Sequence, residues 1–172
     1  METQKITPSL WFDTNTEEAI SYYVEVFNGS PAKRAGSRIV SIQRYEKGME
    51  TPGMPDMEDK ILTAVFELAG QRFMALDGGP YFTFNEAISL LIDCEDQAEV
   101  DYFWERLSAV PEAEQCGWVK DRFGLSWQII PRRMTELLEH EDRTKALAAT
   151  NAMLKMKKID VAELERAFEN AS

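Results

Sequence analysis

The order strand, helix, several strands occurs twice along this chain, at an offset of about 80 residues. The first copy consists of a strand at 6–13, a helix at 16–28 and strands at 37–45, 61–68 and 72–76. The second copy consists of a strand at 85–93, a helix at 95–108 and further strands that end at 131. The letters of the two copies differ, so the repeat is one of architecture. It predicts two α+β halves built alike.

Turn and capping residues support the ends of several elements. Thr16, followed by two glutamates, places a capping hydroxyl and first-turn acids at the start of the first helix. Asn28-Gly29 then ends that helix. Ala69-Gly70-Gln71 separates the strands at 61–68 and 72–76 and predicts a hairpin. In the segment 117–131, Asp121 and Gly124 supply the turn between two strands. The second half is therefore predicted to end in a tight strand pair.

A long loop interrupts the first half. Residues 46–60 contain Gly, Pro, Met and acidic side chains without a helix or strand period. Loops of this length inside a compact domain often cover a binding site. We interpret this loop as a candidate lid.

The character of the chain changes after Pro131, where helical patterns replace strands. Helices are expected at 134–140, 143–156 and 161–168, with Asp160 capping the last. We divide the chain into a domain at 1–131, with repeats at about 5–78 and 79–131, and an extension at 132–172. The extension carries the apolar residues Leu137, Leu138, Leu147, Met153, Leu154, Leu164 and Phe168. We expect them to pack on a two-fold related copy, which predicts a homodimer.

Composition excludes several classes of protein. The formal net charge of −11 opposes binding to nucleic acid, because a phosphate surface requires clustered lysine and arginine. No apolar run approaches the roughly 20 residues of a membrane-spanning helix, and the N-terminus does not resemble a signal peptide. Cys94 and Cys116 lack a metal-type spacing, so we expect two reduced thiols in a cytoplasmic protein. His140, the single histidine, is expected at an exposed helix end.

Several motifs carry a family resemblance. They are Ile6–Asp13, Ala75–Pro80, Phe84–Ser89 and Asp121–Trp127. Together they resemble the PhnB-like branch of the vicinal oxygen chelate superfamily, which includes glyoxalases and bleomycin-resistance proteins. The resemblance implies an α+β fold in which two βαβββ-type repeats form paired, curved mixed sheets around a cup, followed here by the helical extension.

Enzymes of this superfamily hold a divalent metal in the cup. The resemblance places their ligand positions on Pro8, Met74, Ala87 (or Glu86) and Gln128. Proline and alanine offer no donor atom, and a thioether is a poor ligand for hard or borderline cations. We therefore expect neither a metal nor another cofactor.

The same branch often carries the label 3-demethylubiquinone-9 3-methyltransferase. A nucleotide-type pocket for S-adenosylmethionine would require a strand, a glycine-rich turn and a helix in sequence. Gly78-Gly79-Pro80 instead precedes an extended aromatic segment. The sequence does not support the methyltransferase label.

Strand alternation predicts which side chains line the cup. The predicted pocket consists of Leu10, Phe12, Arg72, Met74, Leu76, Ser89, Leu91, Ser126 and Gln128, with Trp118 stacking on a ligand. Such a lining suits a small, mostly apolar organic molecule, and a binding protein is our first hypothesis. An enzyme using Gln128, Asp121 and Cys116 is a second hypothesis. A third is an assembly protein whose cup is packed shut.

Overall fold

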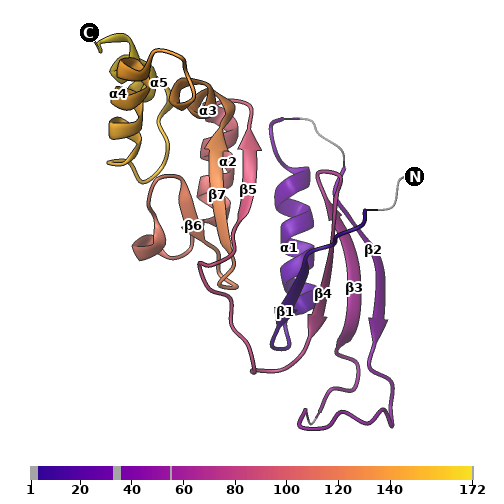
Figure 1. The fold of residues 1–172 in the computed structure, drawn as a ribbon. Coiled ribbons are helices and arrows are strands. Elements are labelled where there is room, and N and C mark those ends of the chain that lie inside the picture. Colours follow the sequence, from indigo (N-terminus) through magenta and orange to yellow (C-terminus); the bar gives the residue numbers. More distant parts are fainter. Residues whose placement is uncertain (1–3, 33–35, 55, 172) are drawn as a thin grey trace. The chain divides into compact units, whose positions relative to one another are not determined.

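The computed structural model describes residues 4–32, 36–54 and 56–171. It confirms the predicted α+β class, with two separate sheets of mixed strands (Figure 1). The chain forms two compact units, the first ending at Phe84 and the second starting at Asn85, with Ser30–Ala32 grouped with the second. Each unit is described by itself below.

The first unit is a four-stranded sheet covered by one helix. Its elements are β1 (Ser9–Phe12), α1 (Thr16–Asn28), β2 (Arg38–Arg44), β3 (Ile61–Leu68) and β4 (Gln71–Asp77). The strand order is β1-β4-β3-β2, with β1 parallel to β4 and the other pairs antiparallel. The predicted hairpin of β3 and β4 turns at Ala69 and Gly70, whose φ angles are 47° and 88°. Such positive φ angles suit a tight two-residue turn.

One face of this sheet and α1 form the core of the first unit. The buried strand residues include Leu10, Phe12, Ala64, Phe66, Phe73 and Ala75, and α1 contributes Ala19, Ile20, Tyr23 and Val26. The rings of Phe66 and Phe73 stack with their centroids 5.3 Å apart. Alternation of buried and exposed residues along β4 marks a sheet with one buried face.

The start of α1 differs from the sequence prediction. The Thr16 side chain does not cap the helix, and its buried hydroxyl has no hydrogen-bond partner among the described residues. Instead, the backbone N–H of Thr16 donates to the Asp77 carboxylate at 2.9 Å. The other carboxylate oxygen of Asp77 accepts the N–H of Ile61 at 2.8 Å. A buried carboxylate distant in sequence therefore replaces the local cap.

The second unit begins with a smaller sheet. Its elements are β5 (Leu90–Cys94), α2 (Gln97–Leu107), a short 3₁₀ helix (Pro111–Ala113), β6 (Trp118–Lys120) and β7 (Ser126–Pro131). The order is β5-β7-β6, with β5 parallel to β7 and β6 antiparallel to β7. This half has one strand fewer than the predicted βαβββ repeat. The predicted strand at 85–93 starts only at Leu90, because the Asn85 side chain accepts the N–H of Ala87 at 3.0 Å and turns the chain there.

The C-terminal extension, here called the tail, packs on the second unit. Its helices are α3 (Arg132–Leu138), α4 (Arg143–Met153) and α5 (Val161–Glu169), and Asp160 caps α5 as predicted, by accepting the N–H of Glu163. The tail shares a buried cluster that consists of Ile130, Met134, Leu137, Ala149, Met156, Ile159 and Leu164. Leu138, Met153 and Phe168 pack against this cluster, whereas Leu147 and Leu154 are exposed. The unit itself therefore buries, fully or in part, five of the seven apolar side chains that we expected to pack on a partner subunit.

Backbone hydrogen bonds tie the tail to the chain before β6. The N–H groups of Cys116 and Gly117 donate to the carbonyls of Met156 at 2.9 Å and Lys157 at 2.8 Å. Gly117 has φ +85°, and a Cβ added there would lie 2.8 Å from Ile130 Cδ1. Only glycine fits this contact without strain.

Within the described ranges, no helix is both long and apolar enough to cross a membrane.

Candidate functional site

Strand register decides which predicted pocket residues share a face, because residues paired across neighbouring strands point to the same side. In the first sheet, Leu10 pairs with Ala75 and Phe12 pairs with Asp77. Leu10 and Phe12 are 7% and 3% exposed, on the face covered by α1. The prediction that they share a face with Met74 is wrong. Alternation determines which side chains of one strand share a face. The register of the parallel pairing of β1 with β4 determines which face of β1 lies beside which face of β4.

The other predicted residues of the first sheet do share a face. Arg72, Met74 and Leu76 alternate along β4, and Trp11 pairs with Leu76. Met74 is 38% exposed. Arg72 is engaged by Glu67, its cross-strand neighbour, at 3.2 Å. This face therefore presents apolar side chains beside a neutralised arginine.

The predicted residues of the second sheet come together as expected. Gln128 on β7 pairs with Leu91 on β5 and with Trp118 on β6. Ser126 lies two residues before Gln128 and pairs with Lys120. The register thus confirms that the predicted residues of these strands share one face; that they bind a ligand stays a prediction. We call the face formed by Leu91, Trp118, Lys120, Ser126 and Gln128 the second-sheet face.

The opposite face of this sheet is core. Val119, Trp127 and Ile129 are each at most 1% exposed. On the second-sheet face, by contrast, Leu91 is 58% exposed and Trp118 and Gln128 are half-buried, although the predicted pocket residue Ser126 is 2% exposed. Ile130, the next residue of β7 on this face, is buried in the tail cluster. The tail therefore closes one end of the second-sheet face.

Ser89 joins the second-sheet face through a side-chain hydrogen bond. The Gln128 amide nitrogen donates to the Ser89 hydroxyl at 2.8 Å. Ser89 directly precedes β5, so this bond links the 85–89 turn to the centre of the sheet. A hydrogen bond of this length holds the amide in one orientation.

Two charged residues of this site were left out of the predicted pocket, and one of them, Glu86, was considered only as an alternative metal-ligand position. Lys120 forms an ion pair with Glu86, and their side chains are 24% and 60% exposed. The hydrogen bond from Lys120 lowers the pKa of the Glu86 carboxyl, so the carboxylate stays charged. Extending the alternation from Trp118 by two residues would have placed Lys120 on the face. No comparable sequence pattern indicated that the 85–89 turn brings Glu86 to Lys120.

Asp121, proposed as part of a non-metal catalytic set, is committed to the hairpin. It is 1% exposed. One carboxylate oxygen accepts the N–H groups of Phe123 and Leu125 at 2.8 and 3.0 Å, and the other accepts the indole N–H of Trp127 at 2.8 Å. Both oxygens thus satisfy buried donors of the fold, so the enzyme hypothesis loses its carboxylate.

Cys116, the thiol of that set, lies where the tail attaches. The residue is half-buried with φ 49°, a left-handed conformation that is rare outside glycine. Its sulfur lies 3.2 Å from the amide nitrogen of Gln115, which also donates to the carbonyl of Leu154 in the tail. These contacts indicate a structural position.

The positions of the family's metal ligands do not fit a metal ion here. The Pro8 carbonyl accepts the N–H of Met74 at 2.9 Å and serves the sheet. Ala87 lies exposed in the 85–89 turn, its alternative Glu86 forms an ion pair with Lys120, and Gln128 is bonded to Ser89. In the described part of the chain, no group of three or more His, Cys, Asp or Glu side chains is arranged to hold a metal. Zinc sites use such nitrogen, sulfur and oxygen donors.

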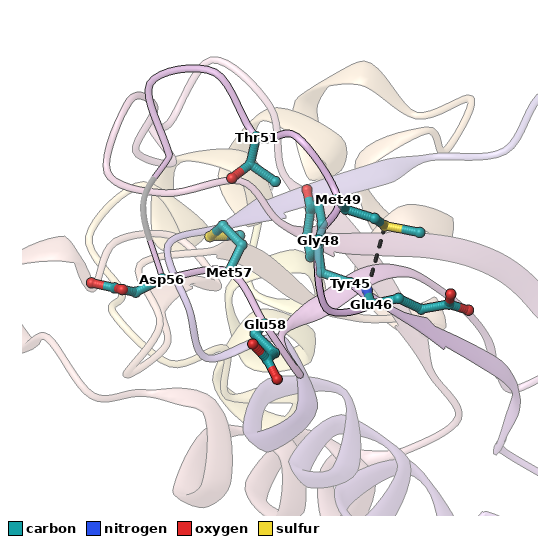
Figure 2. Close-up of a pocket in the computed structure, with 8 residues that line it drawn as sticks. All are labelled: Tyr45, Glu46, Gly48, Met49, Thr51, Asp56, Met57 and Glu58. Carbon is teal, nitrogen blue, oxygen red and sulfur yellow. Dashed lines mark hydrogen bonds between the residues drawn. The ribbon is translucent and has the colours of Figure 1, made fainter.

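The predicted lid, residues 46–60, is folded in its described part and forms a pocket of its own. The pocket of about 220 Å³ is lined by Tyr45, Glu46, Gly48, Met49, Thr51, Asp56, Met57 and Glu58 (Figure 2). Backbone hydrogen bonds from the N–H of Tyr45 to the carbonyl of Lys60 and from the N–H of Asp59 to the carbonyl of Tyr45 close the loop. Within the loop, the Met57 side chain is buried. The Tyr81 hydroxyl also donates to the Gly53 carbonyl. That the loop covers a ligand stays a prediction.

Comparison with known proteins identifies the family. Residues 4–130 match the family model described as 3-demethylubiquinone-9 3-methyltransferase. The chain belongs to this family. A PhnB protein of Bacillus cereus with the same description is 34% identical, with a TM-score of 0.58 over 74% of this chain and 99% of that chain. The predicted PhnB-like resemblance is thus confirmed.

A protein of Pseudomonas aeruginosa shares the fold, with 22% identity and a TM-score of 0.54 over 75% of this chain and 98% of that chain. No curated protein gives a significant match. The family match ends at residue 130, so α3, α4 and α5 lie outside it.

The family description implies a methyl donor cofactor. The turns between strands and helices in this chain do not fit a nucleotide-type pocket for such a cofactor. The chain passes from β1 into α1 through Asp13, Thr14 and Asn15, and from β5 into α2 through Glu95 and Asp96. Neither turn contains the glycines that let a backbone approach a nucleotide. Gly78 and Gly79 follow β4 but lead into no helix.

Proposed function

We propose that this PhnB-like protein binds a small, mostly apolar organic molecule on its second-sheet face. The observation that carries the proposal is the row formed by Leu91, Gln128 and Trp118 across three neighbouring strands. An indole and a leucine side chain flank an amide that Ser89 orients. Apolar walls with a small number of fixed polar groups are typical of small-molecule sites.

The exposure of this row favours binding over a closed core. Leu91 is 58% exposed, although leucine on a β-strand is usually buried. Burying such a side chain against a ligand contributes about 1.5–3 kcal/mol. In an assembly protein whose cup is packed shut, the Leu91 side chain would already be buried, and no such gain would be left for a ligand.

We further propose that binding needs no metal. The support is chemical, since Pro8 and Ala87 offer no side-chain donor and Met74 offers only a thioether, while the carboxylate of Glu86, the alternative to Ala87, is paired with Lys120. Elemental analysis of protein purified without a metal-binding tag tests this. We expect no stoichiometric Zn, Fe, Ni or Mn and an unchanged melting temperature in chelator. One equivalent of any of these metals per chain would contradict it.

The variant Gln128→Leu tests the site. It keeps roughly the same volume and removes the amide, so benzamide, a hydrogen-bonding probe, should bind about 5- to 30-fold more weakly. Ethylbenzene, a purely apolar probe, should bind as before. Tryptophan fluorescence and melting temperature report both, because Trp118 lies beside Gln128.

The matched control is Gln43→Leu, which changes an exposed glutamine on β2. It should leave both affinities unchanged. If neither probe alters the fluorescence or melting of the unmodified protein, the proposed function is wrong.

We also propose that the protein is a homodimer. The tail no longer argues for this, but β2 and β6 lie at the edges of their sheets. Unpaired strand edges are commonly covered by a partner. Light scattering should give twice the mass of one chain, and the mass of a single chain would contradict the proposal.

A further inference from the structure

Lys120 lies on the second-sheet face within reach of its apolar and amide groups. Its cross-strand partner is Ser126, while Trp118 pairs with Gln128. Side chains two residues apart on a strand stand about 7 Å apart on one face, and paired residues stand about 5 Å apart. Lys120, Trp118 and Gln128 therefore surround an area of the size of one aromatic ring.

The chain already places a carboxylate on this ammonium group. Glu86 reaches Lys120 from the 85–89 turn, which the bond between Ser89 and Gln128 holds against the sheet. The carboxylate of Glu86 thus lies at the border of the apolar row. Its side chain is 60% exposed, and exposed ion pairs typically contribute little free energy. Exchange of this carboxylate for another costs little.

We propose that the ligand is an aromatic carboxylic acid whose carboxylate binds Lys120 in place of Glu86, while its ring contacts Trp118 and Leu91. This inference rests on the proposed function and names the ligand class. Glu86 acts as an internal competitor. Lys120 is then the residue that determines specificity, because it separates acids from neutral molecules of the same shape.

The charge around the site favours a single negative charge on the ligand. Replacing one carboxylate by another conserves the charge directly beside Lys120. A bound monoanion adds one negative charge to a chain of net charge −11, whereas a dianion adds two. The Gln128 amide nitrogen uses one of its two N–H groups on Ser89, so a single N–H remains for a ligand, fewer donors than the three oxygens of a phosphonate can accept. A carboxylate is therefore the anion that this face accommodates best.

The test compares benzoate with methyl benzoate, its neutral ester, by calorimetry on the full-length protein. Lys120→Met should weaken benzoate binding about 10- to 100-fold, because a charge-assisted hydrogen bond is lost, and should leave the ester unchanged. Glu86→Gln should strengthen benzoate binding about 1.5- to 5-fold by removing the competitor, again without effect on the ester. An increase in affinity on removing Glu86 is not expected from a merely structural ion pair.

Lys155→Met is the control, since Lys155 is an exposed lysine of the tail. It should leave benzoate affinity unchanged, and melting curves show that each variant is folded. Binding of the ester without binding of benzoate, or tighter binding of phenylphosphonate than of benzoate, overturns this inference and leaves the proposed function standing. Failure of benzoate and of both neutral probes, benzamide and ethylbenzene, overturns both.

Discussion

The two halves of this molecule share a plan and differ in how they complete it. In each half the first strand runs parallel to the last, and a helix follows the first strand. The first half adds β2 outside β3, whereas the second half has no described strand outside β6 and continues into the tail. The shared β-α-β-β unit is therefore what both halves require, and the additional strand or helices are alternatives that each half uses once.

The halves also differ in where they use a buried aspartate. Asp77 links the start of α1 to the start of β3, so it joins elements distant in sequence. Asp121 closes its own hairpin and binds the ring of Trp127. Both carboxylates are at most 2% exposed. Each satisfies backbone donors that would otherwise be buried without a partner.

The largest expected effect separates these two aspartates. Asp121→Ala removes the acceptor of three N–H groups, two of them in buried hydrogen bonds, and should lower the free energy of unfolding by about 3–5 kcal/mol. Asp77→Ala removes the acceptor of two N–H groups and should cost about 2–4 kcal/mol. Urea unfolding followed by circular dichroism measures both. Asp121→Asn, which keeps one acceptor oxygen, should fall between Asp121→Ala and the unmodified protein. A larger loss for Asp77→Ala would contradict the comparison.

The tail provides the next test, because it distinguishes the second half. Leu164→Ala removes a fully buried side chain from the tail cluster and should cost about 2–4 kcal/mol. Leu154→Ala, at an exposed position of the same tail, should change stability by less than about 0.5 kcal/mol. Thermal unfolding of the two variants measures the difference. Equal effects would mean that the tail does not pack on its own chain.

Two glycines with positive φ angles test how closely the backbone is packed where the tail attaches. Gly117→Ala forces a Cβ to within 3.0 Å of the Ile129 carbonyl at φ +85°, and should cost about 2–4 kcal/mol. Gly124 has φ +88° but open space where a methyl group would lie, so Gly124→Ala should cost only the backbone strain of about 1–2 kcal/mol. Urea unfolding gives both values. If the two variants are equally stable, the close approach at Gly117 does not matter.

The smallest effect concerns acid. The hydrogen bond from Lys158 lowers the pKa of Asp101, and the hydrogen bond from Ser108, followed by that from Lys157, lowers the pKa of Glu114. A carboxyl whose pKa is lower in the folded state stabilises it above its unfolded value of about 4, and this stabilisation is lost as the pH falls through the folded pKa. Acid should therefore loosen the tail.

Hydrogen exchange along a pH series measures this loosening. Amides of α4 and α5 should lose protection below about pH 4, before those of α1. Asp101→Asn should remove part of the pH dependence. Loss of protection in α1 first would contradict the assignment of acid sensitivity to the tail.

The sequence by itself determined the local structure of this protein. Repeated strand and helix periods predicted both halves, the Ala69-Gly70 turn and the helices of the tail, and Asp160 was identified as a cap. These features depend on residues only a few positions apart, so their patterns can be read in one segment. The same alternation predicted that Ser126 and Gln128 share a face of their strand.

Only the tertiary structure decided the relations between segments. The pairing of β1 with β4 placed Leu10 and Phe12 in the core, the Asp77 carboxylate replaced the expected cap at Thr16, and the turn at Asn85 brought Glu86 to Lys120. Each relation joins residues far apart in sequence. No local period encodes such pairings, because they depend on which surfaces meet when the whole chain packs.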